Sequence, residues 1–374
     1  MDFGLNETQQ MLKNSAREFL EQECPDTYVR AMEEEERGYT PEMWQKLAQQ
    51  GWLGLVFPEE YGGFGLGFTE LCLILEEMGR ALLPGPFFST VVLGGSAILE
   101  AASEDQKREL LPSIAEGQLL VTLALTEPDA SWDADGVQTA ARRENGGWSI
   151  SGTKLFVPDA HVSDYLVTAA RTGYGPEDVS LFLVPSNAKG LQQALLKTIA
   201  SDRQSEVVFD EVQVPDSALL GQVNKGWETV RRVLQKAAVG KCAEMVGGAE
   251  RVLEMTVEYA KQRVQFGRPI GSFQAVQHHC ANMAVLVEGA RHVTYRAAWY
   301  LAEGLPADQQ VAVAKGWVSD AYRQVCALAH QCHGAIGFTK EHNLQLYTRR
   351  AKAAELAFGD GDYYREAVAQ SIGL

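Results

Sequence analysis

The feature that most constrains the fold is a hydrophobic pattern that changes twice along the chain. Between about residue 120 and Gly221 the sequence consists of short β-rich runs separated by turn signals, among them DYLVTAART and DVSLFLVP. Before and after this block, apolar residues recur at helical spacing. Alternating runs between turns predict an antiparallel barrel or sandwich, and the 3.6-residue period predicts amphipathic helices. We therefore expect a mainly α protein with a central β-domain.

Helix boundary signals divide the chain further. Asn6 and Thr40 are N-cap candidates, and Pro41 suits a first helical turn. After Gly226 the pattern predicts three long helices, over residues 227–263, 272–304 and 308–334, and the last of them ends at a glycine cap. We expect domains at 1–120 (N-terminal helical), 121–222 (middle β-barrel) and 223–374 (C-terminal helical bundle).

Composition excludes several classes of function. The net charge of −16 argues against nonspecific binding to nucleic acid or to an anionic membrane. No apolar run is long enough to span a bilayer, and the N-terminus does not resemble a signal peptide. The six cysteines form no C-x-x-C pair, which indicates free thiols in a reducing compartment. A cytoplasmic enzyme is the simplest prediction.

Motifs of common enzyme classes are missing from the sequence. It contains no Walker A motif, no G-x-G-x-x-G after a strand and no G-x-S-x-G elbow. His278 and His279 are adjacent, so they would point to different faces of a helix, and we expect no metal site. Nucleotide-hydrolysing, Rossmann and serine-hydrolase chemistries therefore have little support.

Three segments are candidates for ligand contact, and each also has a structural interpretation. LALTEPDASWD (123–133) ends a β-rich run and could contact the polar edge of a flat heterocycle, or it could be a turn. RVQFGRPIGSFQAVQH (263–278) offers an arginine for phosphate and a phenylalanine for adenine, or it is a helix–helix loop with a surface arginine. QCHGAIGF (331–338) brings small residues beside a glutamine, or it is a helix cap followed by a loop.

Taken in order, these motifs resemble the acyl-CoA dehydrogenase family over nearly the whole chain. The matching segments are PEEYGG (58–63), LTEP, GTKLFVPDA (152–160), SEVVFDEVQVP (205–215), RVQFGRPI, FQAVQH, QCHGAIGF and RRAK. The resemblance implies an N-terminal helical domain, a middle β-barrel and a C-terminal four-helix bundle. It also implies the cofactor FAD, an acyl-CoA substrate, an electron-transferring flavoprotein as electron acceptor, and a dimer or tetramer, formed with copies of itself or with an unlike homologous subunit.

The resemblance also assigns residues to the cofactor. Those implied at or beside the flavin ring are Leu125, Thr126, Trp132, Phe156, Val157 and Pro158. Those implied at the pyrophosphate and adenosine, in part for a neighbouring subunit, are Arg263, Gln265, Phe266, Gln274, Gln331, Gly334 and Ala335.

The catalytic base departs from the family pattern. Members use a glutamate at one of two positions to remove the α-proton, and here those positions are Phe358 and Ala237. Glu244, about two helical turns beyond Ala237, lies in the apolar segment KCAEMVGGAE and is similar to a glutamate of members that act in steroid and ring degradation. We expect Glu244 to be the base, with a buried structural glutamate paired to an arginine, or a solvated helix residue, as the alternatives. Asp360 and Asp362 are weaker candidates.

Further departures point to an unusual acyl group. Ser131-Trp132-Asp133 replaces a Gly-Ser-Asp segment, Pro158 replaces a flavin-facing threonine, and Ala238 replaces an arginine. The leading hypothesis is α,β-dehydrogenation of a cyclic, branched or steroid side-chain thioester. The alternatives are a non-catalytic or half-site subunit of a heteromeric dehydrogenase, and a redox-neutral enzyme such as an acyl-CoA desulfinase.

Overall fold

The computed structural model describes residues 4–144 and 146–374, which form two compact units. One unit contains the chain up to Arg30, Gly67–Leu83 and Ala238–Leu374, and the other contains Ala31–Leu66 and Pro84–Ala237. Each unit is treated by itself below. The boundaries expected at residues 120 and 222 stay a prediction.

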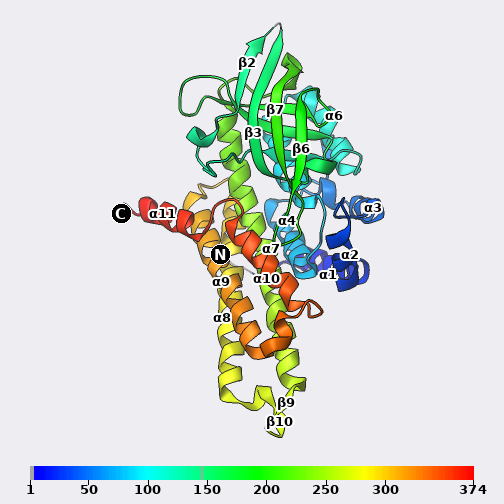
Figure 1. The fold of residues 1–374 in the computed structure, drawn as a ribbon, viewed down its shortest axis with the longest axis vertical. Coiled ribbons are helices and arrows are strands. Elements are labelled where there is room, and N and C mark those ends of the chain that lie inside the picture. The colour runs from blue at the N-terminus through cyan, green and yellow to red at the C-terminus, as the bar shows by residue number, and fades with distance from the viewer. Residues whose placement is uncertain (1–3, 145) are drawn as a thin grey trace. The chain divides into compact units, whose positions relative to one another are not determined.

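The second unit is built on an eight-stranded sheet. Its path of neighbouring strands is β6-β7-β3-β2-β4-β5-β8, and β1 pairs with β4 in parallel (Figure 1). Most of the pairs are antiparallel, as the short alternating runs predicted. The strands are β1 Val121–Ala124, β2 Ala140–Glu144, β3 Gly147–Pro158, β4 Tyr165–Arg171, β5 Val179–Pro185, β6 Leu191–Leu196, β7 Gln204–Pro215 and β8 Leu219–Leu220.

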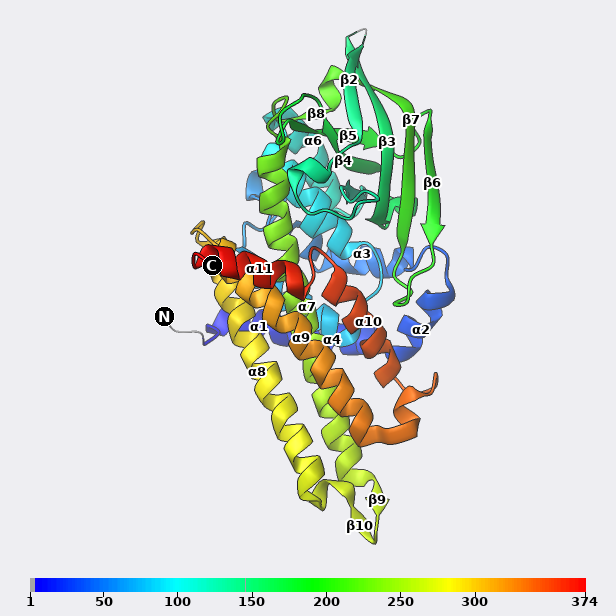
Figure 2. The same ribbon diagram turned by 60° about the vertical axis from the view of Figure 1, so that its left-hand side comes forward.

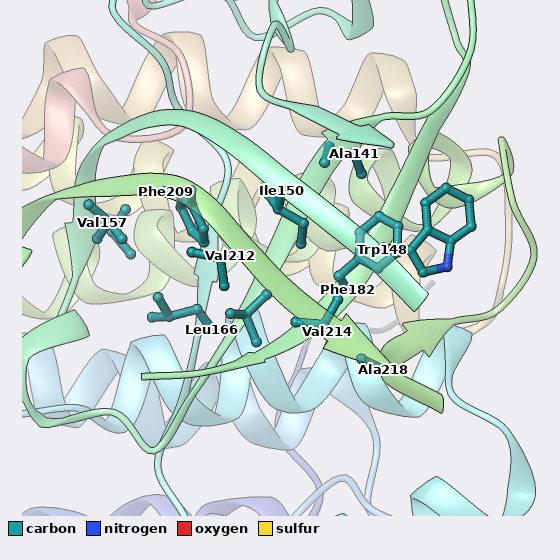
Figure 3. Packing of buried hydrophobic residues seen from close by; sticks show 14 of the residues in the cluster. Ala141, Trp148, Ile150, Val157, Leu166, Phe182, Phe209, Val212, Val214 and Ala218 are labelled. Atoms are coloured by element: carbon teal, nitrogen blue, oxygen red, sulfur yellow. The ribbon is translucent and has the colours of Figure 1, made fainter. Parts of the chain in front are cut away.

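One face of this sheet carries the core of the unit. The rings of Trp148 and Phe182 lie 5.2 Å apart between centroids, and Ile150, Leu166 and Val212 are fully buried in the same cluster (Figure 3). Burial of side chains of this size contributes roughly 1.5–3 kcal/mol each. The sheet is therefore a rigid frame for the loops at its ends.

Helices and helical turns complete this unit. They are α3 Pro41–Gln49, the 3₁₀ turns Trp52–Gly54, Glu59–Tyr61, Ala134–Gly136, Ala160–Val162 and Asp216–Ala218, a π-helix Phe88–Gly95, α5 Ser96–Ala101 and α6 Glu104–Ala115. Helix α2 (Asp26–Glu34) crosses from one unit to the other. The expected cap holds at α3, where the Thr40 hydroxyl accepts from the Met43 N–H at 3.2 Å.

The first unit is helical. In Figure 2, the long helices α7, α8 and α9 run side by side. The helices are α1 Glu7–Glu23, α4 Phe68–Ala81, α7 Gly226–Gln262, α8 Gln274–Ala302, α9 Asp308–His333, α10 Leu344–Leu356 and α11 Gly361–Ser371, with a short hairpin β9 Val264–Gln265 and β10 Arg268–Pro269. Of α7, the part up to Ala237 belongs to the second unit. The three long helices thus match the predicted ranges within a few residues. Asn6 caps α1 as expected, with a complete capping box.

Two glycines let α4 and α7 approach closely. A Cβ at Gly79 would lie 2.0 Å from the carbonyl oxygen of Glu244, and one at Gly247 would lie 1.8 Å from that of Glu76. Neither distance leaves room for a side chain, so these helices cross backbone to backbone. Among the described residues, no helix is long and apolar enough to cross a membrane.

Candidate cofactor and acyl-CoA site

The two segments predicted at the flavin ring lie next to each other in the β unit. The Leu155 N–H donates to the Thr126 carbonyl at 2.8 Å, and the Thr122 hydroxyl donates to the Pro158 carbonyl at 2.7 Å. These bonds align the end of β1 with the end of β3. We call residues 125, 126 and 155–158 together the strand-end surface.

A β-bulge shapes this surface. Lys154 pairs with Val207 and Val157 pairs with Ser205, so three steps on β3 match two on β7. One inserted residue reverses the alternation of side chains. Without it Phe156 would point inward. With it Phe156 is half-exposed at φ +54°, and Val157 is buried.

A buried ion pair lies beneath the same surface. The Lys154 ammonium is fully buried and donates to Glu127 at 2.6 Å and to the Leu125 carbonyl at 3.1 Å. The carboxylate also accepts from the N–H groups of Gln138 and Thr139, each at 3.0 Å. Burial lowers the pKa of Lys154 to about 8. Burial alone would raise the pKa of Glu127, but Lys154 and the two N–H donors outweigh it and hold the pKa below its usual range.

The remaining predicted flavin residues differ in what they can offer. Val157 packs in the core, so only its backbone faces a ligand. Pro158 has no N–H and its carbonyl already accepts from Thr122. Leu125 is nearly buried, whereas Thr126 and Trp132 are partly exposed. A ring bound here would therefore meet mainly Thr126, Trp132 and Phe156.

The predicted phosphate-binding group gathers on the hairpin between α7 and α8. Arg263, Gln265 and Gln274 are exposed, and Phe266 is 91% exposed at φ +54°. Its ring meets Phe273 edge-on at 6.0 Å between centroids and leaves the rest of its surface exposed. The hairpin is thus suited to contact with a large ligand or a second chain.

The third predicted group ends α9. Gln331, Gly334 and Ala335 are exposed, and Gly334 adopts φ +65° with no atom within 4 Å of an added Cβ. Between the ends of α7 and α9 lies a pocket of about 300 Å³. Its lining comes from residues just before and beside the predicted ones: Met255, Glu258, Tyr259, Gln262, His333, Glu341, His342 and Asn343.

Glu244 emerges from a buried stretch of α7. Cys242, Ala243 and residues 245–249 are buried, whereas the Glu244 side chain is 23% exposed. Its carboxylate accepts from the Lys241 ammonium at 2.5 Å, one helical turn away. The residue is therefore neither a fully buried glutamate nor a solvated surface residue, and its cation is a lysine rather than an arginine.

The two positions where family members carry the base are occupied by apolar side chains in contrasting surroundings. Ala237 is fully buried. Phe358 lies in the loop between α10 and α11 at φ +58°. Its carbonyl accepts from the Tyr364 hydroxyl at 2.7 Å, and the next carbonyl, of Gly359, accepts from Lys315 at 2.8 Å. Asp360 caps α11 through the Tyr363 N–H, which gives it a structural role.

Comparison with known proteins identifies the class. Three family models match in order: the acyl-CoA dehydrogenase N-terminal domain at residues 6–118, the middle domain at 122–212 and the C-terminal domain at 224–373. A probable acyl-CoA dehydrogenase of Bacillus subtilis (strain 168), YngJ, is 31% identical, with all of both chains covered. The chain therefore belongs to the acyl-CoA dehydrogenase family, a class of oxidoreductases that use FAD.

Two further relatives are similar over most of their length. The CarC subunit of the caffeyl-CoA reductase–Etf complex of Acetobacterium woodii is 29% identical, with 92% of each chain covered. A chain of the ChsE4–ChsE5 complex of Mycobacterium tuberculosis superposes with a TM-score of 0.91 at 28% identity, with 100% of this chain and 99% of that one covered. The three-part fold predicted from the sequence is confirmed.

The exposure and backbone conformation of these residues fit FAD, independently of the comparisons. The strand-end surface exposes the Phe156 ring in a strained conformation, which suits a planar ligand. The hairpin offers Arg263 and the largely exposed Phe266 ring, and Gly334 leaves open space at the end of α9. Glu127 and Lys154 were not singled out from the sequence, although they lie in the LTEP and GTKLFVPDA segments. The available signal was the position of Lys154, four residues after Ile150 on the same strand. Because side chains alternate along a strand, this lysine faces inward.

Proposed function

We propose that this chain oxidises a coenzyme A thioester with a cyclic or branched acyl group to its α,β-unsaturated form, with Glu244 as the base. Electrons then leave to an electron-transferring flavoprotein. The relative CarC, a subunit of a reductase–Etf complex, supports such an acceptor. A cytoplasmic location stays a prediction.

The reaction divides between the chain and its cofactor. Glu244 takes the α-proton of the thioester onto its carboxylate. FAD, when bound, supplies the acceptor for the β-hydrogen as hydride. The α-proton is weakly acidic, so hydrogen bonds to the thioester oxygen must stabilise the charge that develops there. The strand-end surface would contact the flavin ring, and the hairpin residues would contact phosphate and adenosine, in part those of a ligand on a neighbouring subunit.

The observation that carries this proposal is the environment of the Glu244 side chain. Its carboxylate is partly exposed and has buried apolar neighbours, and the helix backbone at Glu244 packs closely against Gly79. A carboxylate on a rigid element with limited hydration is suited to proton abstraction. Lys241 would have to release or share this carboxylate when the thioester binds, since it holds it at 2.5 Å.

The test is anaerobic mixing of Glu244→Gln protein with a substrate that bleaches the wild-type flavin. We expect FAD to remain bound and the rate of bleaching to fall by roughly 10²–10⁴-fold. Glu228→Gln is the matched control, because Glu228 lies on the same helix and pairs with Arg232 one turn away. Bleaching at the wild-type rate in Glu244→Gln protein would exclude Glu244 as the base.

A second candidate is a half-site subunit of a heteromeric dehydrogenase. The apolar residues Ala237 and Phe358 at the usual base positions favour it, and ChsE4–ChsE5, to which this chain is similar, is a complex of unlike chains. Expressing this chain alone separates the two: an assembled, yellow protein that oxidises a thioester supports the first proposal. A colourless protein that gains FAD only with a homologous partner supports the second.

The same apolar positions leave room for a redox-neutral reaction, such as desulfination of an acyl-CoA. Such an enzyme would convert its thioester without any bleaching of the flavin under anaerobic conditions. Product analysis beside the absorbance record distinguishes it from dehydrogenation.

A further inference from the structure

The Lys154–Glu127 pair joins three segments of the β unit that are far apart in sequence. Through Glu127 it holds the Gln138 and Thr139 N–H groups, and through Lys154 it holds the Leu125 carbonyl. Thr139 in turn touches Gly152, where an added Cβ would lie 2.5 Å from the threonine hydroxyl. All of these contacts surround the end of β1 and the bulge of β3.

Stability alone does not explain a buried ion pair at this place. Removing an ammonium and a carboxylate from water costs free energy, and apolar pairs of similar volume are often as stable or more so. The rest of this core follows that rule, with Trp148, Ile150 and Phe182 in contact. What the ion pair adds is a set of directional bonds to backbone atoms.

Those bonds act on the strand-end surface. Lys154 fixes the Leu125 carbonyl, and one residue further on the Leu155 N–H fixes the Thr126 carbonyl. The next residue, Phe156, lies in the bulge of β3 and has a positive φ that few phenylalanines adopt. A strained residue persists only where its surroundings determine its conformation, and here the Leu155–Thr126 bond lies next to it and Lys154 fixes the neighbouring Leu125 carbonyl.

We propose that the buried Lys154–Glu127 pair positions FAD, by locking the strand-end surface into the conformation against which the flavin ring lies. This inference rests on the proposed placement of the ring beside Thr126 and Phe156. Lys154 and Glu127 act through the backbone atoms to which they bond, so they are positioning residues and not catalytic ones.

The test separates positioning from stability with three variants of the full chain. Lys154→Met and Glu127→Gln each break the pair, whereas the double variant Lys154→Met/Glu127→Leu replaces it with apolar side chains. Glu100→Gln is the control, because Glu100 accepts from Lys236 at 2.7 Å in the same unit but away from the strand-end surface. The measurements are the unfolding midpoint in urea and the dissociation constant for added FAD.

We expect both single variants to bind FAD roughly 10- to 100-fold more weakly. The double variant should recover the wild-type unfolding midpoint yet still bind FAD weakly, with a shifted flavin absorption band. The control should bind FAD as the wild type does. If FAD affinity recovers together with the midpoint in the double variant, the pair is only a structural element and the proposal is wrong.

A second readout decides the matter even if the wild-type chain alone binds no FAD, which would contradict the proposed function. Amide hydrogen exchange at Thr139 and Leu155 in cofactor-free protein reports the lock directly. We expect faster exchange in the double variant than in the wild type or the control. Unchanged protection in the double variant would show that the pair does not fix this surface.

Discussion

Each unit contains a buried lysine near a phenylalanine with a positive φ, and the two lysines bond to different kinds of partner. Lys154 and Lys315 are both fully buried, and burial lowers the pKa of each to about 8. Lys154 meets a carboxylate, whereas Lys315 donates to the Ser319 hydroxyl and to the carbonyls of Glu355 and Gly359.

The phenylalanines beside them have nearly the same backbone conformation. Phe156 follows Lys154 by two residues with φ +54°, and Phe358 precedes the Lys315-bound Gly359 with φ +58°. Family resemblance places the first at the flavin and the second where many members carry the base. In both units a buried ammonium thus bonds a backbone carbonyl near the phenylalanine, once as part of an ion pair and once at the carbonyl end of a helix.

The largest expected effect separates the two lysines. Lys154→Met leaves the Glu127 carboxylate buried without its cation, which should destabilise the protein by about 3–5 kcal/mol. Urea unfolding followed by circular dichroism measures this loss. A loss no larger than that of Lys315→Met would mean that the Gln138 and Thr139 N–H groups alone satisfy the carboxylate.

Lys315→Met should cost less, because it leaves only neutral acceptors without a donor. We expect a loss of about 1–3 kcal/mol in the same urea experiment, since buried carbonyls then lack hydrogen bonds. Lys236→Met is the control, because Lys236 also bonds a partner, Glu100 at 2.7 Å, but is partly exposed. A loss equal to that of the control would contradict a clamping role for Lys315.

Lys315 also predicts a dependence on pH. Its pKa is lower in the folded protein, about 8, than the usual 10.5, so between these values the unfolded chain binds more protons. Stability should therefore rise with pH across this window, by about 1 kcal/mol from pH 7 to 9, as the cost of burying the charge is relieved. The difference between wild-type and Lys315→Met unfolding midpoints, measured from pH 7 to 9.5, isolates this contribution. A difference that stays constant or shrinks as pH rises would contradict it.

The smallest expected effect concerns Phe156, the residue with a positive φ in the bulge of β3. Phe156→Gly removes a half-exposed ring from a positive φ, so we expect the cofactor-free protein to change by no more than about 1 kcal/mol, toward greater stability. FAD affinity should fall nevertheless. A marked loss of stability without loss of FAD affinity would make Phe156 a packing residue.

Much of the fold could be predicted because its signals are local. The capped helices and the long periods of α7, α8 and α9 depend on neighbours within a few turns. No sequence signal marks strand β6, because its residues, LQQALL, do not alternate between apolar and polar. The strand lies at the end of the strand path, with both faces partly exposed.

The site could be predicted only in part. Motif order located the strand-end surface and the hairpin, but the bulge that exposes Phe156 and buries Val157 depends on the register with β7. The bond between Lys241 and Glu244 follows from helical spacing and was available in the sequence. The contact between Gly79 and Glu244 joins segments far apart in the chain, and no local pattern predicts it.

Anaerobic mixing of the purified protein with cyclic, branched and straight-chain acyl-CoA thioesters, followed by flavin absorbance, decides whether this chain is a dehydrogenase. We expect the protein to be yellow and a cyclic or branched thioester to bleach it, with formation of the α,β-unsaturated product. A yellow protein that no thioester bleaches, alone or with a homologous partner, would contradict this expectation.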